Sequence, residues 1–567
     1  MADRILDGGE AIVEAFRNLG IEYVMSSPGS EWGPVWEAFA RQAVDKIEGP
    51  AYLNCGHETL AVDLAVGFTA VTGRMQAVLL HAGVGLMQGS MGIHGARLAG
   101  TPMIVMSGES LTYGDQEGFD PGAQWYTLLG IVGGPQKLAE PFVKWANQAT
   151  SAATLYEMVI RAGELAQRSP TGPTYLNVPI EPMLHPWRPP ARLRKVPRAP
   201  KPQASAVDVE RVAKLLASAR NPVITTESCG REREGYEGLL RLAELLAIPV
   251  VENSVATVAN FPKEHPLHQG FDGAALLAEA DLVLVIRSRV PWYPPNRGPK
   301  NAPVVVIDEC PLNTYMVYQN LQADLFLEGD VPSSLRMLAE AAGSGPGAET
   351  LRERRARWAA AHARIEQGYQ AAIAKTRQSD AIAGIELCAT LSEVLPKNAI
   401  YLDETTTHRR LNSRFLRNEG PQSFFRVPSG LGQCLGVSLG VKLACRERPV
   451  VALVGDGSFL YNPLIPSLAF AKEADLPILV VVYNNRGYRG MRDNHASYYP
   501  TGVGVRHEIF CGQRLNSLDY DELARPFGGF GIRVSDPAAL KAALKEGYTA
   551  VAGGRTAIVN VVLEDPS

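Results

Sequence analysis

Short apolar runs rich in β-branched residues recur along this chain, and stretches with the spacing of amphipathic helices separate them. Runs of this kind are typical of parallel strands whose two faces are both covered by helices. They fall into three blocks, at residues 23–25, 77–81, 103–107 and 174–178, then 222–226, 249–252, 282–287, 304–308 and 325–327, and last 399–403, 450–454, 478–483 and 557–563. The pattern predicts an α/β chain with three doubly wound parallel sheets.

The length of 567 residues also exceeds what one hydrophobic core normally organises. Residues 185–204 hold six prolines and six Arg or Lys residues, so we expect a surface linker without a regular element. A second linker is expected at 343–380, where GSGPG precedes a charged helix from about residue 349 to residue 374. The predicted domains are therefore 1–184, 205–342 and 381–567.

The composition excludes several classes of protein. A net charge of -4 argues against a nucleic-acid binder, which normally carries a basic excess. No stretch is long and apolar enough to span a bilayer, and the first twenty residues lack the basic start and apolar core of a secretion signal, so a cytoplasmic protein is expected. The seven cysteines stand singly, without the spacing of a zinc site or a disulfide framework.

Two neighbouring apolar runs of the third block end in small or oxygen-bearing residues. These are Gly455, Asp456, Gly457 and Ser458 after the run 449–454, and Asn484 and Asn485 after the run 476–483. Because parallel strands present their carboxyl ends at one edge of a sheet, Asp456 and Asn485 are expected to lie together and to offer the oxygens that Mg²⁺ prefers. The glycines let a phosphate approach the backbone, and Ser458 is expected to begin a helix whose N–H groups favour an anion.

Either motif alone is weak evidence, because Asp and Gly are ordinary turn residues. The pair is stronger: 26 residues, 458–483, separate GDG from NN, and this layout closely resembles the cofactor motif of the thiamine diphosphate enzymes. The resemblance implies thiamine diphosphate and Mg²⁺ as cofactors. It implies metal ligands at Asp456, Asn485 and Gly487, and further cofactor contacts from Gly455, Gly457, Ser458, Gly487 and Tyr488.

The same resemblance predicts a glutamate at the start of a helix in the first block, and Glu58 stands there. The stretch Gly56–Gly73 resembles the "HE...A.GYAR.TG" segment of the family and places Leu60, Leu64 and Phe68 on one helical face. In that family the glutamate hydrogen-bonds the pyrimidine ring of the cofactor and starts the proton relay that deprotonates the thiazolium carbon. Taken without the other motif, a glutamate at this position would serve equally to complement the helix dipole.

Further segments resemble active-site loops of the family. They contain Ser30 in SPGS, His81 in LHAGVG, Gln124 in AQWY, Thr406 and Thr407 in DETTT, and Gly430 and Leu431 in SGLG. Leu431 is our candidate for the apolar residue that holds the cofactor in its bent shape.

The closest motifs are those of benzoylformate decarboxylase and the large subunit of acetolactate synthase. Ser30 and His81 would handle protons on the substrate, although a single histidine can also be structural. The second histidine of benzoylformate decarboxylase has no counterpart, because Trp292 and Tyr293 stand in the matching stretch. This departure argues against aryl-glyoxylate decarboxylation.

The segment after the NN motif, residues 489–499, should line the substrate channel of this fold. Its Arg489, Arg492 and His495 suit a carboxylate or another anion, and a solvated helical face is the alternative. The insertion 501–516 shows no clear resemblance to a segment of the family.

The central block leaves a nucleotide cofactor open, since some relatives bind FAD there and others ADP or a coenzyme A nucleotide. Residues 205–340 show no glycine-rich dinucleotide fingerprint. Arg287 and Arg289 follow a predicted strand and would either contact a nucleotide phosphate or cap the sheet.

The resemblance implies a non-oxidative lyase or carboligase that acts on a 2-oxo acid, an aldehyde or an acyloin. The alternatives are an FAD-containing oxidase-type relative, an enzyme like 2-hydroxyacyl-CoA lyase, and an inactive paralogue that binds the cofactor. The resemblance further implies a homodimer or homotetramer with active sites at the subunit interface.

Overall fold

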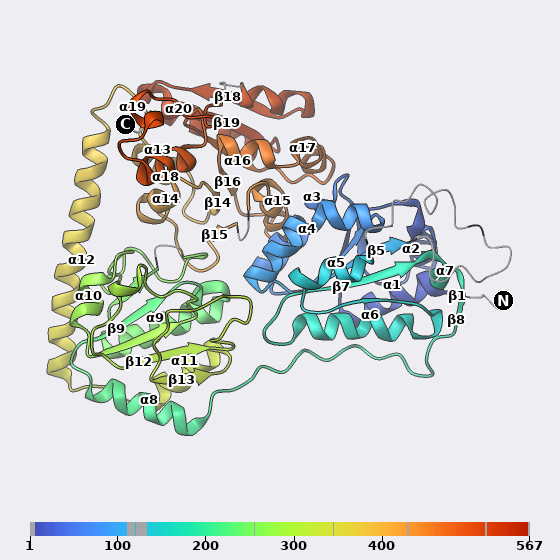
Figure 1. Ribbon diagram of the computed structural model, residues 1–567, viewed down its shortest axis with the longest axis horizontal. Helices are drawn as coiled ribbons and strands as arrows, with labels where there is room; N and C mark the ends of the chain where they lie inside the picture. The colour runs from blue at the N-terminus through green and yellow to red at the C-terminus, as the bar shows by residue number, and fades with distance from the viewer. Residues whose placement is uncertain are drawn as a thin grey trace. The chain divides into compact units, whose positions relative to one another are not determined.

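Three parallel sheets organise the computed structural model, which describes residues 6–109, 120, 133–253, 256–343, 345–427, 430–515 and 519–564 (Figure 1). The first sheet has the order β3-β2-β4-β5-β7-β6. Its strands are β2 (Tyr23–Ser27), β3 (Ala51–Asn54), β4 (Gln76–Leu80), β5 (Met103–Glu109), β6 (Ala146–Gln148) and β7 (Pro173–Pro179). The helices of this region are α1 (Gly8–Leu19), η1 (Ser30–Trp32), α2 (Gly33–Val44), α3 (Glu58–Thr72), α4 (Ala82–Ala99), α5 (Pro135–Ala139), η2 (Glu140–Phe142), α6 (Ala152–Gln167) and α7 (Ile180–Leu184).

The central sheet has the order β10-β9-β11-β12-β13. Its strands are β9 (Pro222–Thr226), β10 (Val250–Glu252), β11 (Leu282–Ile286), β12 (Val304–Asp308) and β13 (Leu325–Glu328). The accompanying helices are α8 (Ala206–Ser218), η3 (Cys229–Arg231), α9 (Arg233–Leu246), α10 (Ala274–Glu279), η4 (Pro295–Arg297) and α11 (Val331–Ala341).

The third sheet has the order β15-β14-β16-β17-β19-β18. Its strands are β14 (Ile400–Glu404), β15 (Phe424–Arg426), β16 (Val450–Gly455), β17 (Leu479–Asn484), β18 (Phe530–Val534) and β19 (Ala557–Val562). The helices of this part of the chain are α13 (Gly384–Val394), α14 (Arg409–Phe415), α15 (Cys434–Ala444), α16 (Asp456–Tyr461), α17 (Leu464–Glu473), α18 (Arg489–Tyr498), α19 (Val503–Arg506), η5 (Tyr520–Phe527) and α20 (Pro537–Ala552).

All strand pairs of the three sheets are parallel, so the predicted fold class is confirmed. The prediction found every internal strand but missed β3, β6, β15 and β18, which are the edge strands of the two six-stranded sheets. Its expectation for residues 185–204 was wrong in one detail, because β8 (Pro186–Trp187) forms an antiparallel pair with β1 (Leu6–Asp7).

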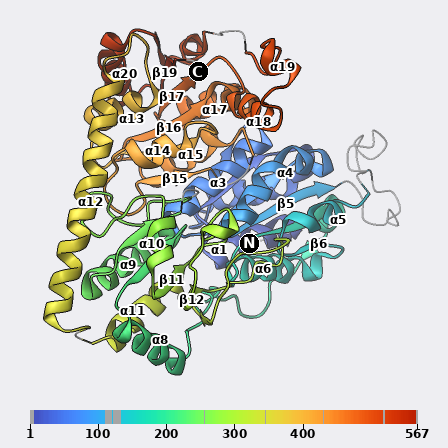
Figure 2. The same ribbon diagram turned by 60° about the vertical axis from the view of Figure 1, so that its left-hand side comes forward.

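Helix α12 (Ala348–Thr376) runs alongside both the central and the third sheet regions (Figure 2). Its Trp358 is buried in the core of the central sheet, and Tyr369 and Ile373 pack against the core of the third. This charged helix therefore packs on two sheets, because its few apolar side chains contact the core of one sheet near its start and the core of the other near its end.

The chain forms two compact units. Unit 1 comprises residues 1–200, 428–446 and 461–476, and unit 2 comprises residues 201–427, 447–460 and 477–567. Helices α15 and α17, which lie in the third block of the sequence, therefore belong with the first sheet. The apolar patterns along the chain do not display this grouping.

Unit 1 owes the packing of α3 on α15 to glycines. A Cβ atom at Gly67 of α3 would lie 2.0 Å from the carbonyl oxygen of Val437, and one at Gly440 of α15 would lie 2.2 Å from that of Leu64. The two helix backbones can approach this closely only because neither position carries a side chain.

We expect Gly440→Ala to lower the stability of the protein by about 1 to 3 kcal/mol, because the added methyl group overpacks this contact. The matched control is Gly368→Ala in α12, where a Cβ meets nothing within 4 Å and the better helix propensity of alanine should raise stability. Calorimetric melting of both variants checks the expectation. A Gly440→Ala variant that melts at or above the wild-type temperature would contradict it.

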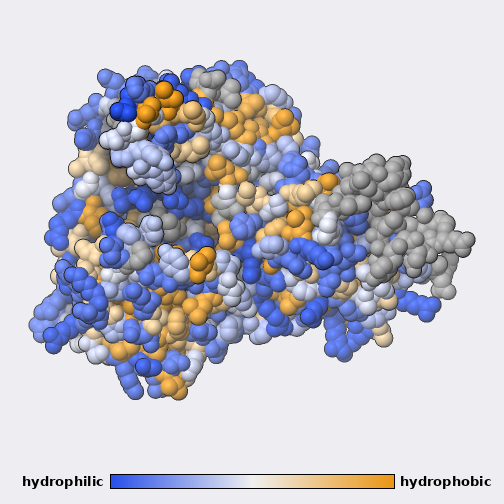
Figure 3. Space-filling model, in the orientation of Figure 1, coloured by the Kyte–Doolittle hydropathy of each residue, from blue (hydrophilic) through white to orange (hydrophobic). Residues whose placement is uncertain are grey.

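In the described part of the chain, no helix is long and apolar enough to cross a membrane. The face shown in Figure 3 mixes hydrophilic and hydrophobic residues. Singly exposed apolar side chains such as Val207 are ordinary on protein surfaces.

Candidate cofactor site

The structure brings the three predicted metal ligands together at one edge of the third sheet. Strand β16 ends at Gly455 and β17 at Asn484, and the two strands are paired neighbours. The carboxylate of Asp456 accepts the backbone N–H of Gly457 at 2.8 Å and that of Gly487 at 3.0 Å. The same N–H of Gly487 lies 3.2 Å from Oδ1 of Asn485. Helix α16 begins at Asp456, two residues before the predicted start at Ser458.

Asp456 is a buried carboxylate, only 2% exposed. Burial raises its pKa to about 6, and the backbone N–H groups around it offset this only in part. Among the described residues no Lys, Arg or His forms an ion pair with it, and an unpaired buried charge is costly. A carboxylate, an amide oxygen and a backbone carbonyl at one place are the ligand types of Mg²⁺, so these residues fit that ion.

Other residues predicted to contact the cofactor surround this cluster. The ring of Tyr488 occupies the space beside Gly457, where a Cβ atom would lie 2.5 Å from it. Ser458, the next residue of α16, is buried. Thr406 and Thr407 follow the neighbouring strand β14 in a turn. The predicted diphosphate contacts of unit 2 therefore gather around the ends of three adjacent strands.

Glu58 and His81 lie together in unit 1. Helix α3 begins at Glu58, and the side chain of His57 caps it by accepting the N–H of Thr59. His81 follows β4 and precedes α4. A Cβ atom at Gly85 of α4 would lie 3.2 Å from Oε1 of Glu58 and 3.4 Å from Cβ of His81. The two predicted catalytic side chains therefore flank one glycine.

A third member of this group, Glu31, was not predicted from the sequence. Its carboxylate is buried, and both of its oxygens lie 3.0 Å from Nδ1 of His81. This hydrogen bond raises the pKa of His81 from its ordinary value, against the opposing effect of burial. The predicted Ser30 is exposed at the start of η1. A carboxylate directly after the SPGS motif was the available signal for Glu31.

The loop with Gly430 and Leu431 lies beside α4 in unit 1. A Cβ atom at Gly430 would lie 3.0 Å from Sδ of Met91. Gly432 has a φ of 104° and leaves no room for a side chain, since a Cβ atom there would lie 2.5 Å from the carbonyl oxygen of Tyr461. Leu431 is half-buried. Gln124 lies outside the described residues.

The cationic side chains of α18 make an ion pair and ring contacts with neighbouring side chains. Arg489 pairs with Asp493 at 2.7 Å, the guanidinium of Arg492 lies over the ring of Phe510, and His495 meets the same ring edge-on. Helix α18 has no buried residue. Both interpretations of this segment, an anion site and a solvated face, remain predictions.

In the central domain, Trp292 is a core residue rather than a replacement for a catalytic histidine. It is 4% exposed and packs against β11 and β12 with Val283, Val285 and Val304. Tyr293 beside it is 76% exposed.

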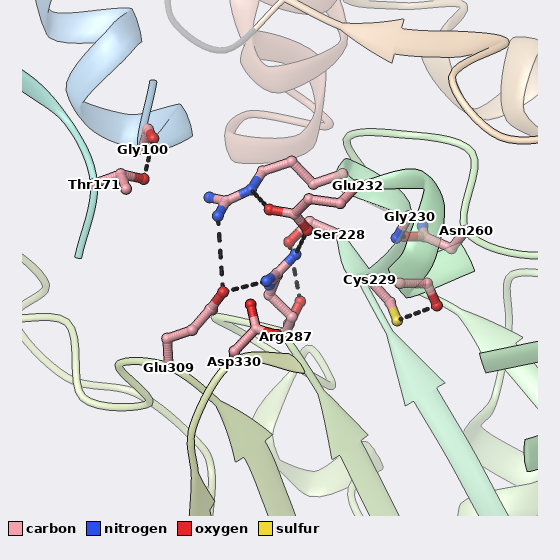
Figure 4. Close-up of polar contacts among 12 residues, drawn as sticks. Gly100, Thr171, Ser228, Cys229, Gly230, Glu232, Asn260, Arg287, Glu309 and Asp330 are labelled. Atoms are coloured by element: carbon pink, nitrogen blue, oxygen red, sulfur yellow. Dashed lines mark hydrogen bonds and ion pairs between the residues drawn. The ribbon is translucent and has the colours of Figure 1, made fainter. Parts of the chain in front are cut away.

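The carboxyl edge of the central sheet is filled by ion pairs. Arg287 is buried directly after β11, and Figure 4 shows it between Glu232 and Glu309, with which its two terminal nitrogens pair. Arg289 is paired with the buried Glu227. Both arginines therefore have carboxylate partners at this edge of the sheet. A nucleotide contact by either arginine stays a prediction.

A fold of three parallel α/β sheets, with an oxygen cluster for a metal and a helix-start glutamate, defines the class of thiamine diphosphate enzymes. Family models of the thiamine pyrophosphate enzymes match the chain three times: the N-terminal binding domain at residues 6–125, the central domain at 209–338 and the C-terminal binding domain at 404–561. The chain belongs to this family.

Relatives match along nearly the whole chain at low identity. The acetolactate synthase isozyme 3 large subunit of Escherichia coli is 25% identical over 99% of this chain and 95% of its own. A protein named as a probable 2-ketoarginine decarboxylase of Pseudomonas aeruginosa is 26% identical over 93% and 92%. The solved benzoylformate decarboxylase from Polynucleobacter necessarius superposes with a TM-score of 0.79, at 20% identity and 99% coverage of both chains. This last likeness shows the fold alone.

Proposed function

We propose that the protein is a thiamine diphosphate- and Mg²⁺-dependent enzyme that makes or breaks a carbon-carbon bond beside a carbonyl without net oxidation. Its substrate class is a 2-oxo acid or an acyloin. Two separate clusters carry this proposal, one in each unit: the oxygen cluster of Asp456, Asn485 and Gly487, and Glu58 beside the same glycine as His81.

Each residue has a role in this proposal. Asp456, Asn485 and the carbonyl of Gly487 hold Mg²⁺, and Ser458 and Thr406 contact the diphosphate. Bound thiamine diphosphate supplies a carbon nucleophile and an electron sink.

Glu58 holds the proton exchanged with the cofactor's pyrimidine, and His81 moves a proton at the substrate oxygen. Ser30 hydrogen-bonds the same end of the substrate. The enzyme works as a homodimer or homotetramer with active sites at the subunit interface.

The ion pairs at the central sheet favour non-oxidative chemistry. An oxidase-type relative would need a flavin to carry electrons away, and Arg287 and Arg289 are already committed to carboxylates. We therefore expect the purified active enzyme to be colourless, with no flavin absorbance in the visible range. A yellow protein that loses activity when its flavin is removed would contradict the non-oxidative assignment.

The proposed reaction is tested by incubating the Mg²⁺-loaded holoenzyme with pyruvate, 2-ketoarginine, benzoylformate and sulfoacetaldehyde, each with and without an added aldehyde. Pyruvate is a small substrate, benzoylformate an aromatic one and sulfoacetaldehyde a sulfonated one. The names of similar proteins suggest 2-ketoarginine, benzoylformate and sulfoacetaldehyde, the last through a sulfoacetaldehyde acetyltransferase of Rhodobacter capsulatus that is 24% identical. We expect release of carbon dioxide or formation of a new acyloin, detected by mass, from at least one 2-oxo acid. Holoenzyme that turns over no member of a wide 2-oxo acid panel would contradict the proposal.

A further inference from the structure

The buried Glu31 and the half-buried His81 form a hydrogen-bonded pair. The side chain of Glu31 is 2% exposed and that of His81 is 23% exposed. Both carboxylate oxygens face Nδ1 of the imidazole at 3.0 Å, and Oε1 also accepts the backbone N–H of Ala82 at 2.9 Å. The carboxylate is thus bound to the histidine and to the first residue of the helix that follows it.

Two glycines beside this pair leave room for its side chains. A Cβ atom at Gly29 would lie 1.7 Å from Nδ1 of His81, and one at Gly108 would lie 1.9 Å from Cγ of Glu31. The fully buried Trp32 anchors η1 by donating from its indole N–H to the carbonyl of Leu80 at 2.8 Å. Two glycines and a tryptophan anchor therefore hold Glu31 against the ring.

The pairing decides which nitrogen of His81 is available for chemistry. A carboxylate can only accept a hydrogen bond, so Nδ1 carries a proton toward Glu31. Among the described residues nothing hydrogen-bonds Nε2. The Cβ atom of His81 and the carboxylate of Glu58 both lie beside Gly85, and the charge of Glu58 acts on the ring. Nε2 is therefore the nitrogen that is left to exchange a proton with a substrate.

We propose that Glu31 is the positioning residue of His81: it holds the imidazole with Nδ1–H bound and makes Nε2 the atom that exchanges a proton with the substrate oxygen. This inference rests on the proposed function. In the step, Nε2–H of the imidazolium donates its proton to the carbonyl oxygen as that oxygen gains charge, and the ring becomes neutral while Glu31 keeps its charge. Nε2 takes the proton back when the carbonyl of the product forms again.

The charges around the ring all favour its protonated form. Glu31 on η1, Glu58 on α3 and Glu109 on β5 act on His81, and each raises its pKa. The hydrogen bond from Glu31 is the largest of these effects, and burial alone opposes them. A histidine held in this way remains an acid at a higher pH than a free one.

The test uses the full-length protein labelled with ¹³C at the histidine Cε1, and the pH titration of His81 followed by NMR. The resonance is assigned by its loss in His81→Gln. We expect Glu31→Gln to lower the titration midpoint of His81, and to lower it more than Glu109→Gln, the matched control that removes a carboxylate without a hydrogen bond to the ring. Glu31→Asp keeps the charge and should give a midpoint between those of the wild type and Glu31→Gln.

The same variants are then assayed on the best substrate of the panel. We expect Glu31→Gln to lower kcat about 10- to 100-fold, to leave thiamine diphosphate affinity unchanged and to shift the basic limb of kcat/KM to lower pH. An unchanged His81 midpoint in both Glu31 variants overturns the inference even if the enzyme turns over. If no substrate is turned over, the proposed function fails, and the titration still decides the role of Glu31.

Discussion

Replacement of Glu58 by glutamine is expected to lower turnover by about 10²- to 10⁴-fold, the range typical for loss of a positioned proton-transfer group. Glutamine keeps the size of the side chain and a hydrogen bond, but it cannot hold the exchanged proton. The helix should survive, because its N-cap is supplied by His57 and its buried face by Leu60 and Leu64. Steady-state kinetics on the best substrate of the panel measure the effect.

The control for this experiment is Glu37→Gln, the same change at a side chain of α2 that is 65% exposed. It should leave turnover unchanged. Thiamine diphosphate should still bind to Glu58→Gln, because the diphosphate clamp is untouched. Turnover of Glu58→Gln within a few-fold of the wild type would refute the assignment of Glu58 and with it the main support for thiamine chemistry.

Asp456→Asn is expected to weaken the Mg²⁺-dependent binding of thiamine diphosphate by about 100-fold or more, since even residues behind a metal ligand change affinity 10- to 100-fold. The change removes the only charge among the three predicted metal ligands and keeps the shape of the side chain. It does not open a cavity, so the fold should be retained. Titration calorimetry with Mg²⁺, and with a chelator in its place, separates metal-dependent from metal-independent binding.

Asp475→Asn is the matched control, because Asp475 is exposed and lies between the same two motifs. Its φ of 51° is also one that asparagine adopts readily. Cofactor affinity should not change in this variant. If Asp456→Asn bound the cofactor with wild-type affinity, and a chelator still abolished that binding, the metal would have to be held elsewhere.

Internal strands could be predicted from the sequence and several edge strands could not, because the two kinds of strand are buried to different degrees. An internal strand such as β16 or β17 is covered on both faces, so nearly every residue must be apolar and the run is visible in the sequence. The missed strands β3 and β6 lie at sheet edges and carry exposed or half-buried residues. Their positions depend on pairing with a neighbour, which a local pattern does not record.

The candidate site divides in the same way. Asp456, Asn485 and Glu58 could be predicted because each stands at a strand end or helix start within a recognisable motif. Glu31 could not, because a glutamate after a turn motif is normally a surface residue, and only the approach of η1 to β4 buries it against His81. The sequence likewise did not reveal that Glu232 and Glu309, far from Arg287 in the chain, pair with it in the fold.

The sequence by itself determined the three parallel sheets, the cofactor class and the residues predicted to contact the cofactor, because buried strands and phosphate-binding turns need particular residues at short spacing. The tertiary structure decided which charges are neutralised, which nitrogen of His81 is bound by Glu31, and which helices belong to the same unit as the first sheet. Those properties arise from contacts between residues far apart in the chain. Burial and charge pairing depend on the whole environment of a side chain, and no local segment contains that information.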